Sequence, residues 1–459
     1  MSTVKIKIND KKTINAWTMY DWANSVFPLV ITSAIFPIFY ENVTKDKITG
    51  NDIVSFLGVD FVNTEIYSYV VSLSYIVVAF LSPLLSGIAD YSGKKKAFMQ
   101  FFCCLGALAT ITMFFFSTDR IELSMFSFFL ASIGFSGSLV FYNAYLPEIA
   151  TPNLHDKVSA KGFALGYIGS SLLLIICLGI ILGKGAEYTQ YAFLLTGVWW
   201  LGFSQITFRA LPSNVYSKKV KGNKLTKGFE ELKKVWEQIK KTKSLKRYLG
   251  AFFVYSMGVQ TVMLMAVFFG TKEIDWAVGL DFSKLTETGA SLLAVKKEMI
   301  DSRMQTGLIV SILVIQFIAV IGAYFMAFLS KKIGNIKTLI FVVFIWSLIC
   351  IVAYLFVHTP IHFYIIAAVI GFVMGGVQSL SRSTYSKLLP ETEDHASFFS
   401  FYDVLEKVGI VIGTFSFGFI DGIFSIREAV LALIVFFVIG LILLLRVPKD
   451  ERLYYKKEV

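Results

Sequence analysis

Twelve long apolar runs, separated by shorter polar segments, dominate the pattern of hydrophobic and polar positions along the chain. A run of about 20 apolar residues is long enough to cross the hydrocarbon core of a bilayer as a helix. None of the runs alternates with the period of two that a β-barrel strand requires. The pattern therefore predicts an all-α membrane protein with twelve transmembrane helices. The runs lie near residues 15–40, 66–87, 97–117, 121–146, 158–183, 190–210, 249–270, 305–330, 337–357, 361–387, 397–420 and 427–446.

One polar stretch is longer than the others and divides the runs into two sets of six. We therefore predict an N-terminal six-helix bundle over residues 1–210, a basic cytoplasmic linker over 211–248 and a C-terminal six-helix bundle over 249–459. Within the linker, the segment Phe229–Arg247 is basic and amphipathic. Two interpretations of it are open: a helix that lies on anionic lipid, or a solvated linker helix.

The two sets of runs resemble each other. Leu146-Pro147-Glu148 ends the fourth run and Leu389-Pro390-Glu391 ends the tenth, and a glycine follows each glutamate at the same distance in the next run. Many secondary transporters consist of two repeated halves, with the solute bound between them near the middle of the membrane. The repetition therefore predicts two pseudo-symmetric bundles and favours a transporter.

Composition and charge agree with a membrane protein and predict its orientation. The chain is 56% hydrophobic and only 16% charged. Its net charge of +11 would suit a nucleic-acid partner, but the lysines and arginines gather in alternate loops, as cytoplasmic loops of membrane proteins do. We therefore expect a monomer in the cell membrane, in contact with lipid, with both termini and the linker in the cytoplasm and no nucleic acid bound.

Asp21 is the most informative polar residue, because it interrupts the first apolar run. An acid at the centre of a membrane helix costs at least about 2.5–3.5 kcal/mol, so it usually faces protein, water or a solute. On a helix, Asp21 shares one face with Trp17, Asn24 and Ser25. One interpretation is that Asp21 and Asn24 bind a solute or a coupling proton. The other is that Asp21 anchors the cytoplasmic end of the helix by pairing with a lysine or arginine.

The loop after the second run, Gly87-Ile88-Ala89-Asp90-Tyr91-Ser92-Gly93-Lys94, resembles the loop signature of the major facilitator superfamily. In that superfamily the acid lies against the N-terminal end of a helix in the opposite half and favours one closed state. The resemblance implies a gating role for Gly87, Asp90, Gly93 and Lys94. The corresponding loop of the second half, residues 328–334, lacks the first glycine and the acid, so a latch on one side only is predicted.

Polar residues also interrupt later runs. Asp403, Glu406 and Lys407 lie in the eleventh run, and Asp403 and Lys407 are four residues apart and can pair along a helix. Together with Arg382 of the tenth run they predict a cytoplasmic gate rather than a direct contact with solute. Five uncharged residues deeper in the runs are candidates for hydrogen bonds to a solute, or alternatively for hydrogen bonds between helices. They are Asn143, Gln205, Gln260, Gln316 and Gln378.

Four segments carry a more specific resemblance: Tyr20–Ser25, Phe141–Glu148, Gly258–Thr261 and Gly375–Ser383. With them the chain resembles the vacuole-effluxer-like branch of the major facilitator superfamily, whose eukaryotic members are autophagy-related exporters of amino acids from the vacuole. The resemblance implies a solute permease. Members of this branch often carry an acid in the seventh run where this chain has Met257, which leaves Asp21 without a counterpart in the second half.

These observations predict a secondary active transporter that moves a small polar solute by rocking two bundles against each other. The family resemblance makes amino acids a candidate solute and efflux a candidate direction. A proton at Asp21 is the first candidate for coupling. Two alternatives are open: a proton-coupled drug or sugar carrier, and a receptor or scaffold that keeps a transporter fold without transporting anything. The sequence shows no clustered nucleophile, base and acid, no nucleotide-binding loop and no metal-ligand spacing, so no enzyme, cofactor or metal site is expected.

Overall fold

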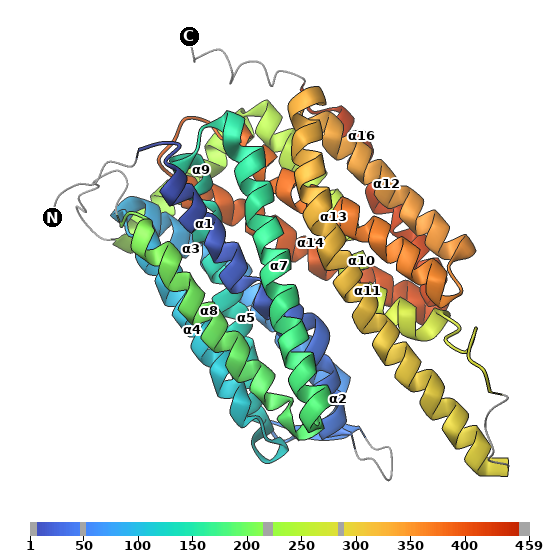
Figure 1. Ribbon diagram of the computed structural model, residues 1–459. Helices are drawn as coiled ribbons and strands as arrows, with labels where there is room; N and C mark the ends of the chain where they lie inside the picture. Colours follow the sequence, from blue (N-terminus) through green and yellow to red (C-terminus); the bar gives the residue numbers. More distant parts are fainter. Residues whose placement is uncertain (1–6, 46–51, 214–223, 283–288, 449–459) are drawn as a thin grey trace.

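The computed structural model describes residues 7–45, 52–213, 224–282 and 289–448. Long helices run side by side through one bundle (Figure 1). The first helix begins and the last helix ends at the same end of this bundle, which is named the terminal end below.

The first span extends from Lys11 to Thr44 in three helical segments: α1 (Lys11–Asn24), the π-helix η1 (Phe27–Ile35) and α2 (Phe36–Thr44). A π-helix is wider than an α-helix and often occurs at functional sites. Here it begins just after the turn that carries Asp21, and Pro28 in its first turn has no backbone N–H to donate. The predicted polar face of this span therefore lies directly beside an irregular segment.

In the rest of the first part of the chain, the described residues form a short antiparallel hairpin and five long helices. Its elements are β1 (Ile53–Phe56), β2 (Val59–Val62), α3 (Asn63–Ser92), α4 (Lys95–Thr112), η2 (Met113–Phe115), η3 (Thr118–Arg120), α5 (Ile121–Asn143), α6 (Leu146–Ile149), α7 (Pro152–Lys184), η4 (Ala186–Tyr188) and α8 (Gln190–Ala210).

In the second part of the chain, all regular elements of the described residues are helices. Its elements are α9 (Lys224–Lys241), α10 (Lys243–Glu273), α11 (Gly289–Ile333), α12 (Asn335–Phe356), α13 (Pro360–Leu388), α14 (His395–Ile423), α15 (Ile426–Ala432) and α16 (Ile434–Leu445).

The structure confirms an all-α membrane protein and describes a helix at each of the twelve predicted runs. Within the described residues, ten helical stretches are long and apolar enough to cross a membrane. The helices α8 and α14 are not among them, yet they lie within the bundle, where α8 packs on α1 and α4 while α14 packs on α3 and α10. The charged residues of α14, which are Asp403, Glu406, Lys407 and Asp421, keep it outside this set.

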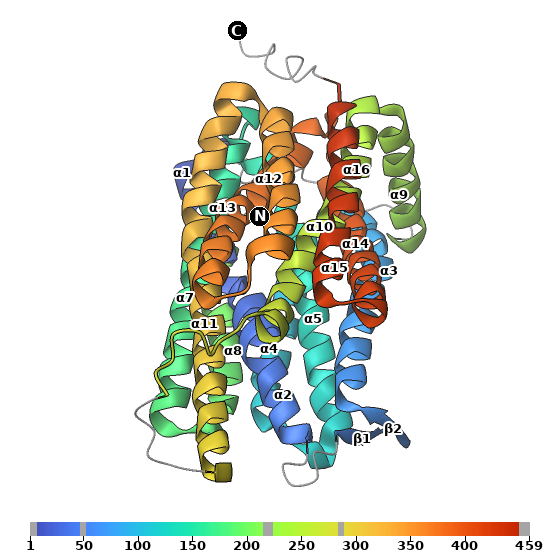
Figure 2. The same cartoon turned by 90° about the vertical axis from the view of Figure 1, so that its right-hand side faces the viewer.

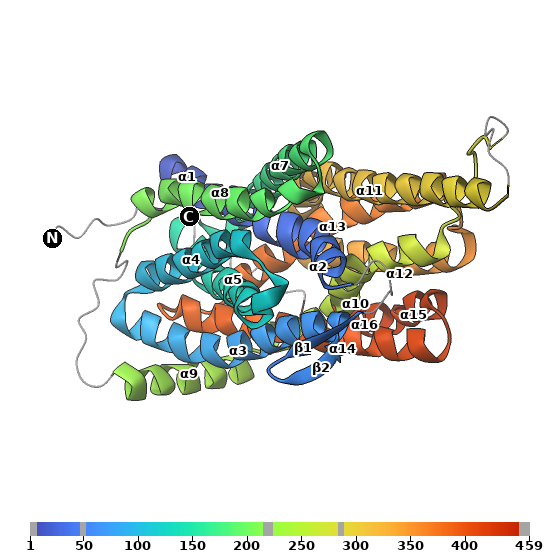
Figure 3. The ribbon, with the colours of Figure 1, turned by 90° about the horizontal axis from the view of Figure 1, so that it is seen from below.

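The helices pack in two groups that meet along two opposite sides. In the first group α4 packs on α5 and α8, and α1 packs on α7; in the second, α11 packs on α13 and α10 packs on α16. On one side of the bundle α3 contacts α14, and on the other α7 contacts α11 and α13 (Figure 3). The candidate site lies between these two lines of contact.

The linker helix α9 packs lengthwise on α3 near the terminal end (Figure 2). The two backbones are in contact at Gly87 and Gly228. A Cβ atom added to Gly87 would lie only 2.4 Å from the carbonyl oxygen of Gly228. Only glycine permits so close an approach. The role of Gly87 in the structure is therefore to allow α9 to pack closely on α3.

Two side chains of α9 also reach the second group of helices. The Trp236 ring stacks on Phe401 of α14, with 5.7 Å between ring centroids, and the Lys234 ammonium lies 2.8 Å from an Asp394 carboxylate oxygen. The hydrogen bond to Asp394 raises the pKa of Lys234. Both interpretations of the linker missed this packing, since α9 lies on protein and contacts both groups of helices.

Candidate functional site

A buried ion pair joins the two groups of helices inside the bundle. Arg382 of α13 donates to Asp21 of α1, with 3.1 Å from Nη2 to Oδ2 and 3.4 Å from Nη1 to Oδ1. Tyr142 of α5 donates its hydroxyl to the same Oδ2 at 2.7 Å. The side chains of Arg382 and Asp21 are only 4% and 6% exposed. Buried charges need a partner and satisfied hydrogen bonds, so this arrangement depends on contact between the two groups.

The remaining donors of Arg382 are also satisfied by the first group. Its Nε donates to the Ser159 hydroxyl at 2.9 Å and Nη2 to the Ser159 carbonyl oxygen at 3.0 Å, both on α7. Its Nη1 lies 3.3 Å from the Asn143 side-chain oxygen. The rings of Phe163, Trp17 and Tyr142 surround the guanidinium with centroids 4.2, 5.0 and 5.5 Å from Cζ. Arg382 thus inserts from the second group into a cage built by the first.

Gly162 of α7 forms the floor under the ion pair. A Cβ atom there would lie 2.1 Å from Asp21 Oδ2 and 3.0 Å from Arg382 Nη2. Even one methyl group would therefore displace the carboxylate. The close packing explains why the pair is shielded from water, and it makes the pair sensitive to small changes in α7.

At the terminal end, Asp90 makes the contact that the loop signature implies. Its carboxylate oxygens accept hydrogen bonds from the backbone N–H groups of Ala396 at 3.2 Å and Ser397 at 2.7 Å, in the first turn of α14. A negative charge is stabilised at this end of a helix. Gly93 follows α3 in the left-handed conformation, with φ of 64°, and lets the chain turn into α4. Asp90 thus holds α14 of the opposite group.

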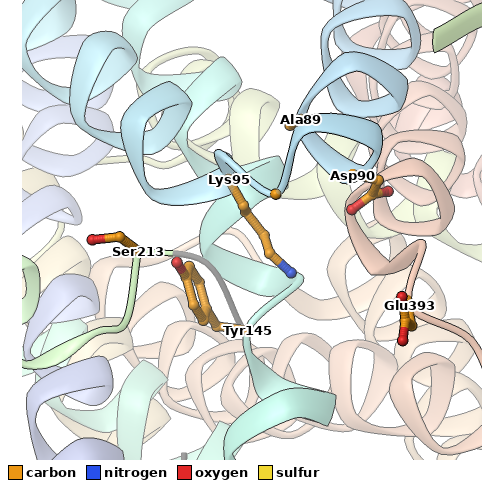
Figure 4. Close-up of a pocket in the computed structure, with 7 residues that line it drawn as sticks. Ala89, Asp90, Lys95, Tyr145, Ser213 and Glu393 are labelled. Carbon is orange, nitrogen blue, oxygen red and sulfur yellow. The ribbon is translucent and has the colours of Figure 1, made fainter. Parts of the chain in front are cut away.

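The lysine that enters this contact is Lys95, whereas the predicted Lys94 is exposed. The Lys95 ammonium pairs with Glu148, and Glu148 also contacts His395 Nδ1 of α14 at 3.0 Å. Figure 4 shows Lys95 extended past Tyr145 into a cavity of about 10 Å³, which is about the space of one water molecule. Asp90, Lys95, Glu148 and His395 together form the first latch.

A second latch lies on the other side of the terminal end, and there the acid stands at the start of a helix instead of in the loop. Asp156 in the first turns of α7 accepts hydrogen bonds from Ser330 at 2.8 Å, from Asn335 at 2.7 Å and from the Lys387 ammonium at 2.7 Å. Ser330 lies in the loop that lacks an acid, and Asn335 directly follows that loop. The prediction of a one-sided latch is wrong, because here the acid stands on α7 and the loop supplies its partners.

These contacts all lie between the middle of the bundle and its terminal end. Farther from that end than the ion pair, the Tyr167 hydroxyl of α7 donates to the side-chain oxygen of Gln378 of α13 at 2.6 Å. The structure is therefore a state in which the terminal end is closed by the ion pair and by both latches.

Comparison with known proteins gives the family. A family model described as "Vacuole effluxer Atg22 like" matches residues 9–453. The chain belongs to the Atg22-like vacuole effluxer family. The uncharacterised MFS-type transporter YxiO of Bacillus subtilis is 30% identical to it over 451 residues, covering 96% of this chain and 95% of that protein. Autophagy-related protein 22 of Yarrowia lipolytica is 23% identical and is matched over 87% of this chain and 78% of its own length.

Solved structures show the same fold for this Atg22-like chain. The human organic anion transporter MFSD10 has a TM-score of 0.66 at 12% identity, covering 95% of this chain and 100% of that one. The proton:xylose symporter XylE has a TM-score of 0.67 at 10% identity, with 95% of both chains covered. The protein is therefore a multi-pass membrane transporter with the major facilitator fold, and not an enzyme.

The structure of this Atg22-like transporter brings together only some of the predicted solute-binding residues. Asp21 and Asn143 meet at Arg382, and Gln378 lies one turn away from it on α13. Asn24 is buried on the same helix as Asp21, and its amide nitrogen has no hydrogen-bond partner among the described residues. Asp21 does pair with a basic residue, as its second interpretation required, but that residue comes from the opposite group.

Sequence reasoning missed three residues of the ion-pair site. Tyr142 stands directly before Asn143 in one of the motifs that carry the family resemblance, so a signal for it was present. Ser159 and Phe163 lie one turn apart on α7. Serine and phenylalanine are common in helices of membrane proteins, so their residue types alone did not indicate a site.

The charged residues predicted in the eleventh run form a separate group in the Atg22-like structure, named the α14 cluster: Asp403, Glu406 and Lys407. The Lys407 ammonium lies 3.7 Å from Asp403 Oδ1 and 3.8 Å from Glu406 Oε2. Gln260 of α10 donates to Glu406 Oε1 at 2.8 Å. Gln260 thus joins this cluster rather than the ion-pair site, and Arg382 does not belong to the cluster with which the sequence grouped it.

Proposed function

We propose that this protein is a secondary active transporter that exports a small zwitterionic solute, with amino acids the favoured class, by alternating access. We further propose that residues 1–210 and 249–459 move as two bundles joined by the linker 211–248. The terminal end is then the cytoplasmic end, with the protein in the cell membrane. The description of the family as vacuole effluxers supports export.

The observation that carries the proposal is the buried ion pair between Asp21 and Arg382, one from each bundle. Opening the terminal end separates the two side chains. Removing one partner from a buried ion pair costs about 3–5 kcal/mol, because the other charge remains without compensation. A bound solute that replaces the lost partners therefore favours the open state.

A zwitterion has the chemistry to replace both partners at once. Its carboxylate pairs with Arg382 and its ammonium with Asp21, and it brings no net charge into the interior. The unpaired amide nitrogen of Asn24 supplies a further donor for the carboxylate. A sugar or a neutral drug offers no charge to either residue. The same two residues then close the gate and recognise the solute.

Counterflow in liposomes tests this proposal. The purified protein is loaded with unlabelled solute, and entry of labelled amino acids is compared with entry of the matching amines, carboxylic acids and a pentose. We expect exchange of zwitterions only, and a loss of about 100-fold or more in Asp21→Asn and Arg382→Gln, since each leaves one charge unpaired. Asp421→Asn at the opposite end of α14 is the matched control. Exchange of the pentose or of the amine alone at an equal rate contradicts the proposal, as does the absence of exchange for every solute.

A further inference from the structure

The α14 cluster contains one more negative charge than positive charges. Asp403 and Lys407 are buried, with side chains 7% exposed each, and the ammonium is shared between two carboxylates at distances too long for good hydrogen bonds. Asp403 Oδ2 is buried and has no hydrogen-bond partner among the described residues. A buried, unpartnered carboxylate oxygen is costly, so it needs a ligand that the surrounding side chains do not provide.

Among the described residues, the groups that face the cluster do not supply a second positive charge. On α3 the Tyr75 ring lies 5.4 Å from the Lys407 ammonium. On α10 the facing groups are Gln260 and Tyr255, and on α14 itself Tyr402 interacts with Glu406. The other helices packed on α14 carry their charges elsewhere. Glu122 of α5 lies in its first turn, Lys234 of α9 bonds Asp394, and Arg427 of α15 bonds Glu273.

We propose that the α14 cluster is the proton site of this transporter, with Asp403 as the group that binds the proton. A proton from water on one side of the membrane adds to Oδ2, which converts the carboxylate to a carboxylic acid, and it leaves to water on the other side. Bound there, it neutralises the excess charge without placing a second cation beside the Lys407 ammonium. A sodium ion in the same place would be repelled by that ammonium.

The coupling site is then Asp403 and not Asp21. Asp21 is already neutralised by Arg382 and accepts a hydrogen bond from Tyr142, so a proton there would have to break an ion pair. Asp403 shares the Lys407 ammonium with Glu406, at 3.7 and 3.8 Å, and its Oδ2 accepts no hydrogen bond among the described residues. It also lies two turns along α14 from the segment that Asp90 holds in the first latch. A change of charge at Asp403 therefore acts on the helix that closes the terminal end.

An infrared titration of the purified protein in lipid tests proton binding without any transport. The C=O band of a protonated carboxyl group should appear as the pH falls, disappear in Asp403→Asn and persist in Asp403→Glu and in Asp421→Asn. A band that is unchanged in Asp403→Asn overturns the proposal. Loss of the band in every variant alike, with the proteins still monodisperse, overturns it as well, because the band then does not belong to Asp403.

The coupling role rests on the proposed transport function and is measured separately. In liposomes that contain a pH-sensitive dye, the ratio of protons to solute moved should fall by about tenfold or more in Asp403→Asn, because the buried acid is lost. The ratio should stay unchanged in Asp421→Asn. If the wild type transports solute with no proton flux, or with a sodium requirement, the coupling role is refuted. If the wild type transports nothing while the infrared band behaves as expected, the proposed function fails and the proton site stands.

Discussion

Replacing Arg382 by glutamine should open the terminal end of the molecule. The substitution leaves the Asp21 carboxylate 6% exposed with the Tyr142 hydroxyl as its remaining strong partner. An unpaired buried charge of this kind costs about 3–5 kcal/mol. Since about 1.4 kcal/mol corresponds to a tenfold change in an equilibrium constant, the closed state should lose roughly 100-fold to a few thousandfold in population relative to the open state.

Amide hydrogen exchange at the first turn of α14 measures this opening. The N–H groups of Ala396 and Ser397 are bonded to Asp90 in the closed state, so they exchange only when the first latch separates. Their exchange should accelerate by that factor in Arg382→Gln. The double variant Asp21→Asn with Arg382→Gln has no unpaired charge and should recover most of the protection.

The comparison between the single and double variants shows whether the ion pair holds the terminal end closed. If the double variant exchanges as fast as Arg382→Gln, the ion pair does not hold the terminal end closed, and the cost derives from lost packing in the aromatic cage. The matched control is Lys272→Gln. The side chains of Lys272 and of its partner Asp421 are 55% and 25% exposed, so this pair is far less buried than the ion pair and is worth at most about 1 kcal/mol.

Three further outcomes are expected. Lys387→Met should break the second latch and accelerate amide exchange in the first turn of α7; unchanged exchange there would show that the latch contributes nothing to closure. Gly162→Ala should abolish counterflow, because the added methyl group meets the Asp21 carboxylate at 2.1 Å, whereas Gly179→Ala has open space and should transport normally. Lys234→Gln should lower the apparent melting temperature at neutral pH by an amount equivalent to at most about 1 kcal/mol. The pKa of Lys234 is raised from 10.5, so this contribution is complete below pH 10.5 and is lost as the pH rises through the raised pKa. The variant and the wild type should then melt alike, and a difference in melting temperature that does not shrink as the pH rises above 10.5 would refute the assignment.

The helices of this fold follow directly from the apolar runs, because a segment in a bilayer must satisfy its own backbone hydrogen bonds. Asp21 and Arg382 were identified for the same reason, since a charge within an apolar run is costly. Their pairing was not predicted. The pair joins positions far apart in the sequence, and it forms only when the terminal end of the bundle is closed. No pattern in the sequence indicates which end of the bundle is closed.

The second latch and the position of α9 were missed for different reasons. Asp156 follows Pro152 at the start of a helix, where an acid is common for purely local reasons, so its pairing with Lys387 gave no separate signal. The amphipathic pattern of α9 indicates that one face is buried, and the same pattern suits lipid or protein. The contact between Gly87 and Gly228 decides for protein, and only the three-dimensional arrangement reveals it.

The position of α9 determines how the closed end can move. It bridges α3 and α14 on one side of the bundle, while on the other side, where α7 meets α11 and α13, the described residues include no bridging helix (Figure 3). When two groups of helices are held together on one side, they separate most on the opposite side. We therefore expect the entrance to be narrow beside α9 and widest beside α7, so that an incoming solute passes Asp156 and Ser159 on its way to Arg382.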